Sequence, residues 1–177
     1  MKILKILLGI VAGLLIIFFV GGLFLPKTYS VNRSTVINAP DSVIYTNIAD
    51  FNEFYKWNPW AKMEPTAKTT VTGTIGQPEH LYAWEGDKTG SGQMKVKSVT
   101  LNKMVDIELK FIKPFESLAD TRFDITKEGE GNKVTWTMSG ENVGTMNKWM
   151  GLMMDGMIGK DFEDGLKNLK EKSESDK

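Results

Sequence analysis

The sequence contains no cysteine and only one histidine, His80. The absence of cysteine excludes disulfides, thiolate nucleophiles and cysteine-ligated metal sites. With no cysteine and a single histidine, a catalytic triad, a zinc centre or a paired-histidine motif is hard to assemble. We therefore assign no catalytic residue, metal site or cofactor, and we interpret His80 as an ordinary strand or turn residue.

An excess of positive charge is missing as well. The chain carries 22 basic and 22 acidic residues, and Lys2 and Lys5 are the only charged residues before Lys27. Without these two lysines, 20 basic residues face 22 acidic ones. Partners rich in phosphate are recognised by clustered Lys and Arg, so we expect no nucleic-acid partner.

A long hydrophobic run is present near the N-terminus. Ile6 to Leu25 has no charged or polar side chain, and Pro26 and Lys27 follow it. A helix of this length spans about 30 Å, the thickness of a bilayer's hydrocarbon core. A buried core helix would normally have a polar face, and a cleaved signal peptide has a shorter apolar region ending in small residues. We therefore interpret Ile6–Leu25 as an uncleaved membrane anchor.

The charges at the two ends of this run indicate its orientation. Lys2 and Lys5 favour a cytoplasmic N-terminus under the positive-inside rule, which Lys27 opposes weakly. We expect residues 1–26 to form a cytoplasmic stub and a transmembrane helix. The domain after them is then expected on the periplasmic or extracellular side.

The rest of the chain alternates mainly between apolar and polar residues, which is typical of strands. Short segments rich in Gly, Pro, Asn and Asp separate these runs and predict turns. Two short helices are expected between the first two strands, one through Val43–Ile48 and one over Phe51–Lys56, followed by a break at Trp57–Trp60. The predicted strands are Tyr29–Ile37, Thr69–Gly73, His80–Gly86, Gly92–Leu101, Met104–Ile112, Ser117–Thr126 and Lys133–Asn142.

The last predicted element is a helix over about Thr145–Lys172. Phe162, Leu166 and Leu169 form one narrow apolar stripe in its second half. In the first half, apolar residues surround most of the helix, so more than one face there must be shielded from water. Residues 27–172 are expected to form the domain, and residues 173–177 a charged tail that frays.

This order of elements predicts an α+β fold. Short connections between consecutive strands favour antiparallel pairing, and a seven-stranded sheet is expected to curl around the long C-terminal helix. The layout is a helix-grip fold preceded by one transmembrane helix.

Several motifs in the domain resemble those of the START-like, or SRPBCC, superfamily, in particular its polyketide cyclase/dehydrase-like branch. The resemblance covers nearly everything after Pro26. The motifs that carry it are Arg33–Pro40 leading to Ile48–Asp50, Trp57–Trp60, Trp84–Gly86 with Gly90–Gly92, and Met157–Leu166. It implies a deep cavity between the sheet and the long helix that holds lipids, sterols, polyketides or other apolar molecules. The resemblance carries no particular reaction.

Tryptophans and methionines are the candidates for lining such a cavity. Tryptophan provides a large rigid wall with one polar group, and methionine adapts to variable apolar partners. Either type also fills ordinary cores, so both interpretations stay open for these residues. The candidate ligand-binding residues are Trp57, Trp60, Tyr82, Trp84, Met94, Trp136, Met138, Met150, Met153 and Met157.

The leading functional hypothesis is a membrane-tethered domain that binds a small hydrophobic or amphipathic ligand, lipid-like or polyketide-like, in an internal cavity. One alternative is a cyclase-type or hydrolase-type enzyme, for which Glu85, His80, Tyr82 and Asp106 are the candidate acids or bases. By strand alternation, Glu85 is expected to face solvent. Another alternative is a protein-interaction module with the same fold, for which the sequence indicates no particular protein partner.

Overall fold

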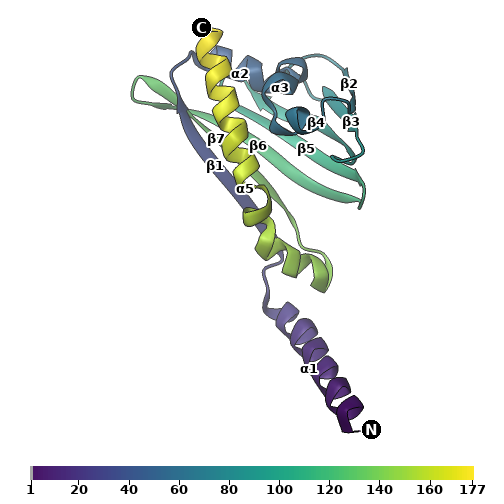
Figure 1. Cartoon of the computed structure of the whole chain (residues 1–177). Coiled ribbons are helices and arrows are strands. Elements are labelled where there is room, and N and C mark those ends of the chain that lie inside the picture. Colours follow the sequence, from purple (N-terminus) through teal and green to yellow (C-terminus); the bar gives the residue numbers. More distant parts are fainter. Residues whose placement is uncertain (1) are drawn as a thin grey trace.

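The apolar N-terminal run forms one helix, α1 (Lys2–Phe24), in the computed structural model, which describes residues 2–177. The helix is long and apolar enough to cross a membrane. Its leucine, isoleucine and phenylalanine side chains are nearly all exposed, and Gly22 is its one buried residue. Figure 1 shows α1 projecting away from the rest of the chain, at the end opposite the C-terminus.

Seven strands and four further helices follow α1. Strands β4, β6 and β7 alternate between buried and more exposed residues over most of their length, as expected for a sheet with one covered face. The elements are β1 (Thr28–Ile37), α2 (Asp41–Ala49), α3 (Phe51–Trp57), α4 (Pro59–Met63), β2 (Lys68–Thr72), β3 (Leu81–Glu85), β4 (Ser91–Thr100), β5 (Met104–Lys113), β6 (Ser117–Glu128), β7 (Gly131–Glu141) and α5 (Gly144–Ser175).

The strands form one antiparallel sheet in the order β1-β7-β6-β5-β4-β3-β2. Strands β2 to β7 are a continuous meander, and β1 is added beside β7, where Thr28 pairs with Glu141 and Ile37 with Asn132. Helix α5 lies along the β1–β7 side of this sheet (Figure 1). The predicted seven-stranded helix-grip fold is confirmed.

The second half of α5 is held to the sheet by an aromatic stack. Trp136 of β7 stacks on Phe162 of α5, with ring centroids 4.1 Å apart and an interplanar angle of 9°. On its other side Trp136 stacks on Phe123 of β6 at 4.9 Å, and its Nε1–H donates to Oγ1 of Thr121 at 2.8 Å. This hydrogen bond satisfies the one polar group of a tryptophan that is only 2% exposed.

An ion-pair cluster holds the middle of α5 against β1. The guanidinium of Arg33 lies over Gly159 and donates to the carboxylates of Asp155 and Glu163 at 2.8 Å each. The hydrogen bond to Asp155, followed by that to Glu163, raises the pKa of Arg33 above its ordinary value. Both carboxylates remain largely exposed to solvent.

Two helix boundaries differ from the sequence-based expectation. The Trp57–Trp60 break contains the start of α4, because Pro59 occupies its first turn and Oδ1 of Asn58 accepts from the backbone N–H groups of Trp60 and Ala61. The expected charged tail continues α5 through Ser175, because Ser173 is fully buried and bonded to Asn47 at 3.2 Å.

Replacing Gly165 with alanine is expected to destabilise the domain by about 1–3 kcal/mol, the usual effect of overpacking. A Cβ atom there would lie 2.8 Å from the ring of Trp136 and 3.2 Å from Pro59. Gly156→Ala is the matched control on the same helix, since nothing lies within 4 Å of its Cβ position. It is expected to be neutral or to stabilise by up to about 1 kcal/mol. Urea unfolding followed by circular dichroism measures both, and equal effects would contradict the packing role of Gly165.

Candidate functional site

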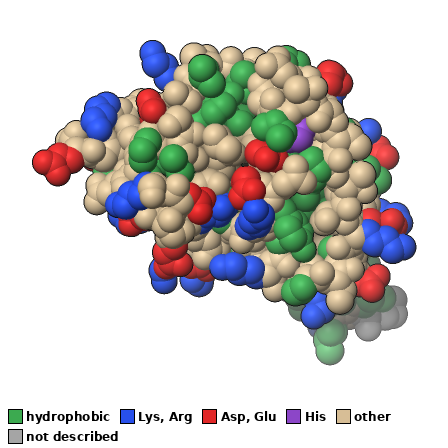
Figure 2. All heavy atoms as spheres, turned by 90° about the horizontal axis from the view of Figure 1, so that it is seen from above, with side chains coloured by type: hydrophobic (Ala, Val, Ile, Leu, Met, Phe, Trp, Pro, Cys, Tyr) green, Lys and Arg blue, Asp and Glu red, His purple; other side chains and the backbone are tan. Residues whose placement is uncertain are grey.

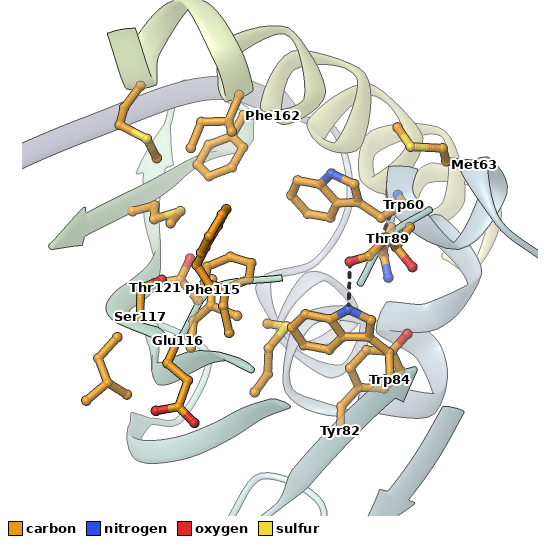
Figure 3. Close-up of a pocket in the computed structure, with 18 of the residues that line it drawn as sticks. Trp60, Met63, Tyr82, Trp84, Thr89, Phe115, Glu116, Ser117, Thr121 and Phe162 are labelled. Atoms are coloured by element: carbon orange, nitrogen blue, oxygen red, sulfur yellow. Dashed lines mark hydrogen bonds between the residues drawn. The ribbon is translucent and has the colours of Figure 1, made fainter. Parts of the chain in front are cut away.

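A cavity of about 730 Å³ lies between the sheet and the first half of α5. Its walls come from the inward faces of β3 to β7, from α3 and α4, from the β5–β6 turn and from α5. Figure 3 shows an open space between Trp60 and Phe162 on one side and Trp84 on the other. The walls are mostly apolar, so the space is suited to an apolar molecule.

Most predicted ligand-binding residues reach this cavity. Those on strands do so because alternate residues face the same side of a sheet, so that Tyr82 and Trp84 on β3 point inward together, as do Trp136 and Met138 on β7. The predicted residues in the lining are Trp60, Tyr82, Trp84, Met94, Trp136, Met138 and Met150.

Three predicted residues lie elsewhere. Trp57 is packed inside the core, 1% exposed, with its Nε1–H donating to the carbonyl of Asn47 at 2.7 Å. Met153 and Met157 are on a solvent-exposed side of α5, 63% and 57% exposed. We expected these three residues to line the cavity, and the structure corrects this expectation, because none of them is part of the cavity wall.

The lining contributed by α5 follows a regular spacing that the sequence analysis missed. Met146, Met150, Met154, Ile158 and Phe162 all line the cavity, at intervals of four residues. Residues at i and i+4 are neighbours on one side of a helix, so this row forms a continuous wall. This four-residue repeat is present in the sequence, but the many other apolar residues in the same half of α5 do not let it stand out as a single face.

The β5–β6 turn and the start of β6 add two exposed side chains to the cavity rim. Phe115 is 81% exposed and Leu118 61% exposed, and both line the cavity (Figure 3 labels Phe115). Phe115 lies in the turn, where residues have no periodic pattern, so the sequence offered no signal for it.

Glu64 fixes the β3–β4 turn beside the cavity. Its carboxylate accepts hydrogen bonds from the backbone N–H groups of Asp87, Lys88 and Thr89 and from the hydroxyl of Thr89, at 2.8–3.1 Å. The hydrogen bonds from Thr89, with those from Asp87 and Lys88, lower the pKa of Glu64 to about 2 against the effect of burial. The carbonyl of Thr89 in turn accepts from Nε1 of Trp84 at 3.3 Å, the bond drawn dashed in Figure 3.

The candidate acids and bases do not form a reactive group in the cavity. Glu85 is exposed and 3.6 Å from Lys113, as strand alternation predicted, and Asp106 lies 3.9 Å from Lys97, outside the lining. Tyr82 does line the cavity. Burial is the main cause that raises the pKa of Tyr82 to about 12, so its hydroxyl stays protonated near neutral pH.

His80 is a structural residue of the core. It is 1% exposed and stacks on Phe51, with ring centroids 4.7 Å apart. Nε2 accepts from the backbone N–H of Phe51 at 3.2 Å, so Nδ1 carries the proton and donates to the carbonyl of Thr72 at 2.9 Å. Both ring nitrogens are thus occupied. Among residues 2–177, no three histidine or carboxylate side chains cluster closely enough to hold a metal ion.

Comparison with known proteins places this fold and cavity in a family. The model of a family described as polyketide cyclase/dehydrase and lipid transport matches residues 28–174, which is nearly the whole domain. The chain belongs to this family. No curated protein matches it.

Solved structures with this fold are only distantly related in sequence. A protein from Thermobifida fusca has 14% identity and a TM-score of 0.62, and the match covers 81% of this chain and 92% of that one. The Aha1 dimer from Colwellia psychrerythraea has 17% identity and a TM-score of 0.57, covering 82% and 96%. The di-domain ARO/CYC protein StfQ of the steffimycin biosynthetic pathway has 8% identity and a TM-score of 0.62, covering 84% and 51%. Identities this low show a shared fold and no more.

Glu64→Gln is expected to loosen the β3–β4 turn, because a neutral amide accepts weaker hydrogen bonds than a carboxylate. The backbone amides of Asp87, Lys88 and Thr89 should exchange with deuterium about tenfold faster, as seen by mass spectrometry. Glu116→Gln is the control, since this exposed residue also lines the cavity without contacting the turn.

The same carboxylate predicts a pH dependence. Because the folded-state pKa of Glu64 lies below its ordinary value of 4.5, its stabilising effect is complete above about pH 4.5 and is lost as the pH falls toward 2. The difference in unfolding free energy between wild type and Glu64→Gln should shrink over this window. A difference that stays constant down to pH 2 would contradict the assignment.

Proposed function

We propose that this chain is a membrane-tethered binding protein for a small hydrophobic or amphipathic molecule. The single observation that carries the proposal is the cavity of about 730 Å³ with its mostly apolar walls. This volume is within the range of about 300–1,000 Å³ found for small-molecule sites. The description of the matched family, which includes lipid transport, supports a lipid-like or polyketide-like ligand.

The cavity has the few polar groups that such a ligand needs for orientation. The Tyr82 hydroxyl, the Asn58 amide and the Thr121 hydroxyl are among its lining groups. Most of the remaining lining residues are aromatic or aliphatic, and burial of apolar ligand surface contributes about 25 cal/mol per Å². This arrangement suits a molecule with a long apolar part and one polar end.

The tether is the second element of the proposal. Helix α1 is long and apolar enough to cross a membrane, and its hydrophobic side chains have almost no protein neighbours. With Lys2 and Lys5 on the cytoplasmic side, the domain lies on the periplasmic or extracellular side. The cavity is then held near the membrane in which apolar molecules are concentrated.

Binding is favoured over the two alternatives by the nature of the cavity. Catalysis by a general acid or base needs a group that titrates near the working pH, and two titratable residues of the lining do not fit this role, since the pKa of Tyr82 is raised to about 12 and that of Glu64 is lowered to about 2. A protein-interaction module does not need an internal space, and here such a space is present.

Leu109→Trp is expected to shorten the cavity and so to change the ligand preference. Leu109 lines the cavity from β5, next to Met94 of β4. Affinity for a long-chain fluorescent fatty acid should fall about tenfold, equivalent to about 1.4 kcal/mol, whereas affinity for a short-chain analogue is kept. Displacement titrations with the full-length protein measure both values.

Ile112→Trp is the control on the same strand, because Ile112 is exposed and outside the cavity lining. It should bind both chain lengths as the wild type does. Equal losses in the two variants, or no binding of any fatty acid, phospholipid or sterol probe by the wild type, would overturn the ligand-binding proposal.

A further inference from the structure

The N-terminal half of α5 packs on the membrane-spanning candidate α1. The Nε1–H of Trp149 donates to the carbonyl of Phe18 at 3.1 Å, and the two rings stack with centroids 6.1 Å apart. The ammonium of Lys148 donates to the carbonyl of Gly22 at 2.9 Å, and Thr145 lies against Gly22. These contacts fix the position of the start of α5 along the axis of α1.

Trp149 contacts α1 before the apolar run of that helix ends. From Phe18 to Leu25, where the run ends, a helix rises about 10 Å at 1.5 Å per residue. If α1 spans a bilayer over Ile6–Leu25, the Phe18 carbonyl that Trp149 contacts therefore lies about 10 Å inside the hydrocarbon edge at Leu25. The first turns of α5 then cannot remain in bulk water.

The composition of this half of α5 fits such a position. Between Gly144 and Gly159 the charged residues are Lys148 and Asp155, and the side chain of each is directed to a partner, Gly22 or Arg33. Four large apolar side chains of this half are more than half exposed. They are Met146, Leu152, Met153 and Met157, each between 55% and 63% exposed.

The rim of the cavity is at the same end of the domain. Asp120 of β6 pairs with Ser139 of β7, so Leu118 lies near the end of β7 that leads into α5. Phe115, Leu118, Met146 and Met150 are exposed and also line the cavity. The rim that faces away from the protein core therefore presents large apolar side chains, with Glu116 and Ser117 of the same turn region beside them.

The opposite end of the domain has a different surface. Figure 2, which looks down on the end turned away from α1, shows acidic and basic side chains interspersed across the face with small apolar patches between them. The concentration of exposed apolar residues beside α1 thus continues the apolar surface of α1 itself. Lipid already surrounds that surface in the proposed function, which favours lipid over a protein as the occupant of the adjoining surface.

We propose that the N-terminal half of α5 and the β5–β6 turn insert into the membrane leaflet nearest the domain, so that the cavity opens directly onto the lipid. This inference rests on the membrane tether of the proposed function. An apolar helix face in this position is buried about 5–10 Å into the boundary between headgroups and acyl chains. A ligand with an acyl chain passes from the leaflet into the cavity between Met150 and Phe115 without crossing water.

The absence of native cysteine permits a direct test with single-cysteine variants of the full chain. The variants Met153→Cys, Leu118→Cys, Val20→Cys and Lys167→Cys are labelled with the fluorophore NBD and reconstituted into phosphatidylcholine/phosphatidylglycerol vesicles. Quenching is measured with phosphatidylcholine carrying a doxyl group on its acyl chain. Val20 reports on α1, and Lys167 is an exposed position farther along α5.

We expect quenching at Met153 and Leu118 to reach at least about half of that at Val20, with little at Lys167, given the expected insertion depth. Quenching at Val20 alone would overturn the insertion and leave the tether intact. A blue-shifted but unquenched label at Met153 would identify a protein contact and would also overturn it. No quenching at Val20 would overturn the tether and this inference together, without affecting ligand binding in the cavity.

Discussion

The stack of Trp136 between Phe123 and Phe162 is the contact on which the arrangement of the domain depends. It joins two strands to α5 at a single point, and Trp57 and Trp60 meet the same ring edge-on at 5.8 and 5.9 Å. Beyond this point, toward the C-terminus, α5 packs closely on the sheet through buried leucines. In the other direction it no longer fills the space above the strands, and the cavity begins there.

Helix α5 therefore meets two different environments along its length. Phe162, Leu166 and Leu169 form a single buried stripe, as in an ordinary amphipathic helix. The preceding turns are apolar on several sides, and only one of those sides faces the cavity. Gly151, Gly156 and Gly159 lie in this half, where Figure 1 shows the helix bending, and glycine is a common site of such bends. The bend separates the part that belongs to the core from the part beside α1.

The sequence predicted the strands and the cavity residues on them well, because alternation encodes which side chains share a face. It could not separate Trp57 from Trp136, since both are aromatic residues in apolar surroundings and only tertiary packing decides which one reaches the cavity. Glu64 was missed because its partners lie more than twenty residues away in a turn. The buried end of α5 was missed because the segment is highly charged, and Ser173 and Lys172 are held there by Asn47 and Glu53.

The connection between α1 and β1 consists of Leu25, Pro26 and Lys27. The amide N–H and side chain of Asn142 hold it by donating to the carbonyls of Lys27 and Pro26 at 2.8 and 3.2 Å. Three extended residues reach only about 10 Å, so this connection keeps the domain close to the end of α1. If α1 is the membrane anchor proposed above, a domain held this closely does not reach a second membrane. A ligand bound as proposed is then returned to the same bilayer or handed to a second protein that comes to the domain.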